Sequence, residues 1–294
     1  MKLKDIIAGY RYRDLDLHEI NFLTESDEDI NLFCHWLSSA DLIIVRFRNH
    51  KDVESKGIDF SLLKPETIVN IFTAIVANPT IEELDLSRCN LGGIRNPDLL
   101  DAIFKVLGIK EFTSLSVAKN RLSVTSMVQL KKWAAVRTKK LYLSGNCLDS
   151  VDVDMLAQLL KVADTNERLE ELYLDRCELG RALCSDLIIG EYTHPNSSRE
   201  KIEELRLDAQ ARMEELWAEF ISVTALNRLD ISYNELPEWF DEEMLKIRDE
   251  HNANLKLDVD EYRYDMPLVP AVAAAGAADR LSTGSSSTPQ ASST

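Results

Sequence analysis

The sequence predicts an α/β solenoid, in which short parallel strands stack side by side and helices return the chain from one strand to the next. Near copies of one pattern, L-x-x-L-x-L-x-x-N/C-x-L, recur along the chain. Their mean spacing is about 28 residues, which leaves room for a helix between consecutive copies. Several of the intervening segments carry apolar residues at helical spacing.

Seven copies of the pattern cover the middle of the chain. IEELDLSRCNL (81–91) and LEELYLDRCEL (169–179) are almost identical, and further copies begin at residues 112, 138, 202, 226 and 252. Two weaker copies begin at residues 12 and 42. Alternate residues of a strand face opposite sides, so the leucines of each L-x-L face a shared interior. The pattern therefore predicts eight or nine strands in one parallel sheet.

The ninth position of the pattern lies where the chain turns away from the strand and its backbone polar groups become buried. An asparagine amide can hydrogen-bond those groups, and a cysteine is small enough to be buried there. This position holds Asn120, Asn146, Asn234, Cys89, Cys177 and, as a departure, Gln210. We therefore interpret Cys89 and Cys177 as structural residues rather than as nucleophiles.

Helices are expected where capping residues precede apolar stripes. Asn96 and Pro97 predict the start of a helix that ends at Gly108. Ser26 and Asp29 have capping-box spacing and predict a helix near the N-terminus. Further helices are expected from about residue 62 and over 124–136, 153–163 and 237–250. Packing against the strands accounts for all of these apolar stripes.

The chain is expected to have three parts. Residues 1–41 are predicted to form an N-terminal cap with a degenerate first repeat, and residues 42–265 the repeat array with its C-terminal cap. Residues 266–294 contain a single Asp and a single Arg among mostly small residues. Because little in this composition drives packing, we expect a disordered Ala/Ser/Thr-rich tail.

The repeated pattern resembles that of leucine-rich repeat proteins. The helical return and the spacing are similar to the ribonuclease-inhibitor-like type, which also includes repeat regions of NOD-like receptors, tropomodulin and the Ran GTPase-activating protein. The resemblance covers roughly residues 42–262. It implies a horseshoe with an inner parallel β-sheet and outer helices, and it does not imply one function, because relatives use the same scaffold differently.

The charge of the chain bears on its partners. There are 34 Lys and Arg residues against 50 Asp and Glu, a net charge of −16. Such an acidic protein repels a phosphate backbone, so we expect no nucleic acid and favour a partner protein with a basic surface. No stretch approaches the roughly 20 apolar residues of a membrane span. Five cysteines and no secretion signal lead us to expect a cytoplasmic location, with the nucleus left open.

No motif of a catalytic or metal site is evident. The sequence lacks a phosphate-binding glycine loop, a nucleophile elbow, a CxxC pair and a zinc-binding histidine motif. We therefore expect no enzyme activity, no cofactor and no metal. Two alternatives stay open, namely a regulator of a small GTPase, because the Ran GTPase-activating protein shares this type of repeat, and a substrate-recruiting adaptor of a ubiquitin ligase.

Function is expected on the concave strand face, where alternate side chains project into solvent. The residue between the two leucines gives a row of Arg46, Asp85, Ser116, Tyr142, Tyr173, Arg206, Asp230 and Lys256. Tyr142 and Tyr173 are equivalent residues in adjacent copies, so their rings should lie about 5 Å apart.

Tyrosine and arginine are enriched at binding hot spots. We therefore predict a non-catalytic module or scaffold that binds a partner protein through this pair. Ordinary exposed strand residues are the other interpretation, because tyrosine has a good strand propensity. The candidate binding residues are Asp85, Arg88, Tyr142, Tyr173, Asp175, Arg176, Arg206, Asp230 and Tyr233.

Overall fold

The computed structural model describes residues 2–48, 58–122, 138–146, 168–179, 226–234 and 252–259, together with separate positions between 201 and 250. Contacts divide the chain into two units, Met1–Glu261 and Tyr262–Thr294. The tail predicted for 266–294 lies outside the described residues, as do the helices expected over 124–136 and 153–163.

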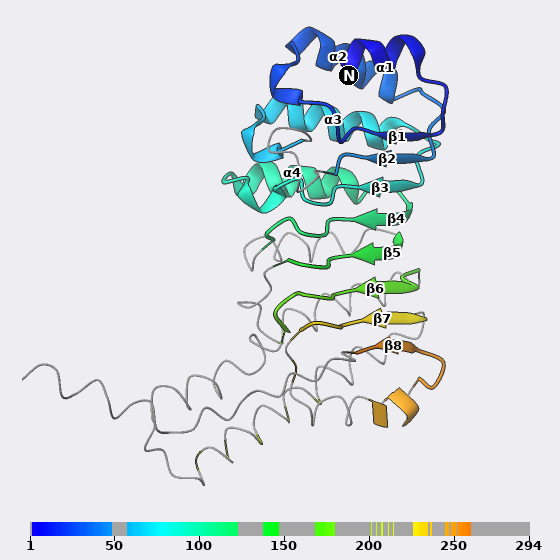
Figure 1. Ribbon diagram of the computed structural model, residues 1–294, viewed down its shortest axis with the longest axis vertical. Coiled ribbons are helices and arrows are strands. Elements are labelled where there is room, and N and C mark those ends of the chain that lie inside the picture. Colours follow the sequence, from blue (N-terminus) through cyan, green and yellow to red (C-terminus); the bar gives the residue numbers. More distant parts are fainter. Residues whose placement is uncertain are drawn as a thin grey trace, which may run out of the picture. The chain divides into compact units, whose positions relative to one another are not determined.

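In the described part of the chain, eight short strands form one parallel sheet, in which they follow one another in chain order (Figure 1). Equivalent leucines are paired in register, for example Leu84 with Leu115 and Leu141 with Leu172. The α/β solenoid predicted from the repeats is therefore confirmed. The strands are β1 (Asp14–Asp16), β2 (Ile44–Arg46), β3 (Glu83–Asp85), β4 (Phe112–Ser116), β5 (Thr138–Tyr142), β6 (Glu171–Tyr173), β7 (Arg228–Asp230) and β8 (Lys256–Asp258).

Within the described residues, one α-helix precedes the first strand and three others connect the first four strands (Figure 1). Ser26 caps α2 by accepting the Asp29 N–H at 3.0 Å, and Asn96 caps α4, as the sequence predicts. The third helix begins at Pro65, slightly later than expected, and the first helix had no signal that we recognised. The helices are α1 (Leu3–Gly9), α2 (Asp27–Leu37), α3 (Pro65–Ala77) and α4 (Pro97–Leu107), and the short 3₁₀ turns are η1 (Phe22–Thr24), η2 (Phe60–Leu62) and η3 (Leu91–Gly93).

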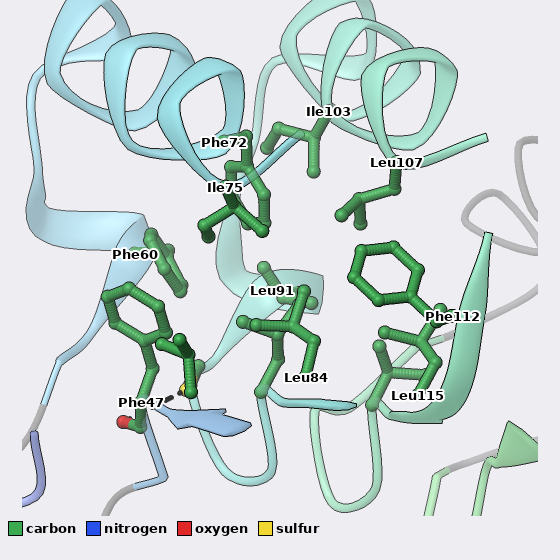
Figure 2. Packing of buried hydrophobic residues seen from close by; sticks show 14 of the residues in the cluster. Phe47, Phe60, Phe72, Ile75, Leu84, Leu91, Ile103, Leu107, Phe112 and Leu115 are labelled. Carbon is green, nitrogen blue, oxygen red and sulfur yellow. Dashed lines mark hydrogen bonds between the residues drawn. The ribbon is translucent and has the colours of Figure 1, made fainter. Parts of the chain in front are cut away.

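The hydrophobic core lies between these helices and the sheet. Phe72 on α3 and Ile103 on α4 point toward Leu84 and Leu115 of the strands (Figure 2). The residue at the fourth position of the pattern is buried in each of β1 to β7, from Leu15 to Leu229, whereas its neighbours on either side are partly or fully exposed. One face of each of these strands is therefore sealed by the core, and the other remains available for function.

The asparagines of the ninth position tie one repeat to the next. The Asn120 amide donates to the Leu86 carbonyl of the preceding repeat at 2.8 Å, and its Oδ1 accepts the Leu91 N–H at 3.1 Å. Asn146 and Asn234 bond in the same way to the repeats before them. All three side chains are buried, so the amide replaces the water that these backbone groups lose.

The prediction of a strand beginning at residue 202 is wrong. Lys201, Glu204 and Leu207 are helical, and β6 pairs directly with β7. Leu207 is 57% exposed, although the pattern requires an interior residue there. The segment has apolar residues at 202, 205, 213, 216, 217 and 220, which is helical spacing, and Gln210 replaces the turn residue. The candidate residue Arg206 lies outside the described residues, and no strand brings its segment beside Tyr173.

The register of the last strand also differs from the prediction. Leu229 pairs with Leu257, so the last L-x-L pair is Leu257 and Val259 rather than Leu255 and Leu257. As a result Asp258, and not Lys256, continues the row that contains Tyr173 and Asp230. This two-residue shift brings a carboxylate to the row where the sequence analysis expected a cation.

Candidate functional site

Two rows of side chains cross the sheet on either side of the buried central residues, and we call them together the strand face. The third-position row holds Asp14, Ile44, Glu83, Ser114, Lys140, Glu171, Arg228 and Lys256. The fifth-position row holds Asp16, Arg46, Asp85, Ser116, Tyr142, Tyr173, Asp230 and Asp258.

The most distinctive feature of the strand face is the pair of tyrosines on β5 and β6. The rings of Tyr142 and Tyr173 stack with their centres 4.2 Å apart and their planes 10° from parallel. The Tyr173 hydroxyl donates to Glu171 Oε2 at 2.6 Å, which fixes the orientation of the second ring. The predicted adjacency of the two rings is thus confirmed, and the pair forms a preformed aromatic surface.

Charged side chains hold Glu171 in its ionised form and Tyr173 in its neutral form. Lys140 Nζ lies 2.8 Å from Glu171 Oε1. Hydrogen bonds from Lys140 and Tyr173 lower the pKa of Glu171. Burial and the hydrogen bond to Glu171 raise the pKa of Tyr173. At neutral pH the Tyr173 hydroxyl is therefore a donor to a carboxylate, and the arrangement is charge-assisted.

Arg228 on β7 packs on the outer face of the tyrosine pair. Its guanidinium carbon lies 5.1 Å from the centre of the Tyr173 ring, a cation–π contact. Its Nε donates to Asp258 Oδ2 on β8 at 2.8 Å, and a second nitrogen lies 2.7 Å from the same oxygen. The sequence analysis left Arg228 and Asp258 out of the candidate residues, because the contact depends on the register of β8.

A second set of candidate residues lies just beyond the strands, at the eighth position of the pattern. Each of these residues has a left-handed backbone, which is uncommon for residues other than glycine. In four of them, all except Tyr233, the N–H is seen to donate to a carbonyl of the next repeat, for example Arg176 N to Ser232 O at 3.0 Å. The residues and their φ angles are Arg88 (61°), Lys119 (57°), Gly145 (67°), Arg176 (56°) and Tyr233 (58°).

The structure brings some of the predicted residues together and separates others. The Arg176 guanidinium lies 4.6 Å from the Tyr233 ring centre, and Asp175 precedes Arg176, so these three form one edge beside β6 and β7. Arg88 follows β3, three strands away from β6. Asp85 and Asp230 accept the N–H of the serine two residues ahead, at 2.8 and 3.1 Å, so both also shape the turn that ends their strands.

The described cysteines lack the features of a catalytic site. Cys34, Cys89 and Cys177 are free and buried. Burial raises the pKa of Cys34 to about 11 and also raises that of Cys89, so both are protonated thiols at neutral pH. Cys89 and Cys177 each place Sγ 3.4 Å from a carbonyl of the preceding repeat, as expected of structural residues.

Within the described residues we find no cluster of three side chains suited to a metal ion. In the same part of the chain no helix has both the length and the apolar character needed to span a bilayer.

Comparison with known proteins finds one family match, which is confined to a single repeat. A family model described as "Leucine Rich repeat" matches residues 77–94, which contain β3 and the start of its turn. No curated protein matches the chain. Among solved structures, the chain is similar to the tropomodulin C-terminal domain of Caenorhabditis elegans, with 12% identity, a TM-score of 0.39, and coverage of 64% of this chain and 93% of that one. The matched repeat lies on one of the strands of the parallel sheet and agrees with the solenoid predicted from the repeated pattern.

Proposed function

We propose that this protein is a non-catalytic interaction module or scaffold that binds a partner protein on its strand face. Leucine-rich repeats generally mediate binding between proteins, and the stacked pair of Tyr142 and Tyr173 is the observation that carries the proposal. A pair that is already stacked and hydrogen-bonded loses little side-chain entropy when a partner covers it. Tyrosines of this kind are typical anchors of an interface.

The surroundings of the pair support the same proposal. Lys140 with Glu171 and Arg228 with Asp258 frame the two rings with oriented charges, which give specificity rather than raw affinity. The net charge of −16 favours a partner with a basic surface, because it steers such a partner toward the protein. The buried cysteine thiols among the described residues support a reducing, cytoplasmic location.

The type of repeat is a further part of the proposal. In the N-terminal half a helix follows each of β2 and β3 before the chain enters the next strand. A full helix on the return path is typical of the ribonuclease-inhibitor-like class, to which we assign the chain. In this class strands and helices alternate, and we place the binding surface on the strand face.

The test compares the affinity of a captured partner for the full-length chain and for two variants. The double variant Tyr142→Ala, Tyr173→Ala should weaken binding at least tenfold, since truncating a hot-spot residue costs about 2 kcal/mol or more. The control variant Tyr12→Ala removes a tyrosine that is 75% exposed and lies outside the strand face, and it should leave the dissociation constant unchanged. Circular dichroism checks that each variant is folded. An unchanged constant for the double variant would reject the site.

Enzyme activity is tested separately. The purified protein is added to a panel of GTP-loaded small GTPases, and release of phosphate is timed. We expect the rates to equal those of the GTPases alone. Stimulated release by the wild-type chain would overturn the assignment as a non-enzyme.

A further inference from the structure

The two outer faces of the tyrosine pair have different neighbours. Beyond Tyr173, the next strand supplies the Arg228 guanidinium and the strand after it supplies the Asp258 carboxylate. Three consecutive strands thus present an aromatic ring, a guanidinium and a carboxylate in that order. On this side of the pair, the Tyr173 ring is therefore covered by Arg228, a residue of the protein itself.

Beyond Tyr142 the same order occurs without the guanidinium. The neighbouring strand β4 presents only Ser114 and Ser116, and the strand after it presents Asp85 in the row of the tyrosines. A serine side chain is too short to cover an aromatic ring. Two strand spacings of about 4.8 Å separate the backbones of Asp85 and Tyr142, which leaves room for one planar group between them.

The carboxylates beside this gap, Asp85 and Glu83, form no ion pair with a described residue. The nearest strand-face cation is Arg46 on β2, which lies in register with Asp85 and interacts with it electrostatically, but the guanidinium of Arg46 is hydrogen-bonded to Asp14. Asp85 Oδ1 accepts the Ser87 N–H at 2.8 Å, so its carboxylate is already oriented. The Ser116 hydroxyl is engaged with that of Ser87, also at 2.8 Å.

We propose that the gap over Ser114 and Ser116 receives an arginine side chain of the partner protein, with its guanidinium stacked on Tyr142 and bonded to Asp85. The proposal rests on the proposed function and specifies the chemistry of the partner. Arg228 shows the same arrangement within the chain on the other side of the pair. A guanidinium suits the gap better than an ammonium, because it is planar, stacks on aromatic faces and bonds carboxylates through several donors.

The test uses three peptides of the form acetyl-Gly-Gly-X-Gly-Gly-amide, in which X is arginine, lysine or citrulline, the neutral analogue of arginine. Each is titrated into the full-length chain carrying ring-labelled tyrosine, and the NMR signal of Tyr142 is followed. We expect the arginine peptide to shift this signal saturably and to bind at least fivefold more tightly than the other two. Equal binding of arginine and citrulline, or of arginine and lysine, would overturn the proposal.

Variants locate the bound peptide. Asp85→Asn should weaken binding of the arginine peptide about fivefold, and the control Asp41→Asn, which removes an exposed carboxylate paired with Arg13, should not. Ser116→Arg should fill the gap from within and abolish the Tyr142 shift, whereas the uncharged Ser116→Gln should retain part of it. The amide spectrum of each variant reports whether it is folded. Undiminished binding to folded Asp85→Asn would contradict the site.

The same variants separate this inference from the proposed function. A captured partner that loses affinity for the double tyrosine variant but keeps it for Ser116→Arg would refute the arginine site and leave the proposed function standing. If the double tyrosine variant binds the partner with an unchanged dissociation constant, the proposed function is refuted, regardless of the results with the peptides.

Discussion

The strand face of β1 and β2 differs from that of β5 and β6. On the first two strands, Arg46 is bonded to Asp14 and Arg48 to Asp16, so charges are paired across the strands. On β5 and β6, the same fifth position carries two stacked aromatic rings. Exposed ion pairs contribute little to stability and present no large apolar area. The same position of the repeat therefore carries paired charges at one end of the sheet and an aromatic pair in its middle.

The largest expected effect is on stability, when a hydrogen bond between repeats that supports both regions is removed. Asn120→Ala leaves the Leu91 N–H and the Leu86 carbonyl buried without their partner. Each such loss costs about 1–3 kcal/mol, so we expect the free energy of unfolding to fall by about 3 kcal/mol. Urea unfolding followed by circular dichroism measures this change.

Asn70→Ala is the matched control for that variant, because Asn70 is an exposed asparagine on α3. Its free energy of unfolding should stay within about 0.5 kcal/mol of the wild type. Equal stability of the two variants would show that the ninth-position amides are not the ties between repeats.

A smaller effect, on the affinity for the partner, should distinguish the two regions from each other. Arg228→Ala removes the cation that supports Tyr173, and we expect the affinity for the partner to fall about fivefold, the equivalent of about 1 kcal/mol. Arg46→Ala removes an arginine of the self-paired region and should change the affinity less than twofold. The dissociation constants are measured by titration calorimetry. If both variants weaken binding equally, the contact surface extends to β2 and the comparison fails.

Most strands could be predicted from the sequence because the pattern depends on the burial and hydrogen bonding of residues close together in the chain. Alternation fixes which residues of β3 to β7 are buried, and the Asn or Cys at the ninth position reports where each strand ends. These two signals were enough to predict from the sequence that Tyr142 and Tyr173 are adjacent. The fold and the centre of the candidate site were therefore predictable.

The prediction failed where one local pattern fits two structures. The segment from Ile202 satisfies both the leucine spacing and the helical spacing. The helical positions Lys201, Glu204 and Leu207, together with the direct pairing of β6 with β7, decide between them. In the last repeat three apolar residues, Leu255, Leu257 and Val259, allow two registers. Pairing with β7 selects one of them, and this pairing places Asp258 against Arg228. Contacts between strands far apart in sequence decide such details.

Site-specific photo-cross-linking tests most directly whether the partner binds the strand face beside the tyrosines. A benzophenone amino acid is placed at Ser144, two residues after β5, or at Val69, on the helix α3. The captured partner is then irradiated with each variant. We predict an adduct from position 144 and none from position 69. An adduct from position 69 alone would contradict the account, because the partner would then contact the helices instead.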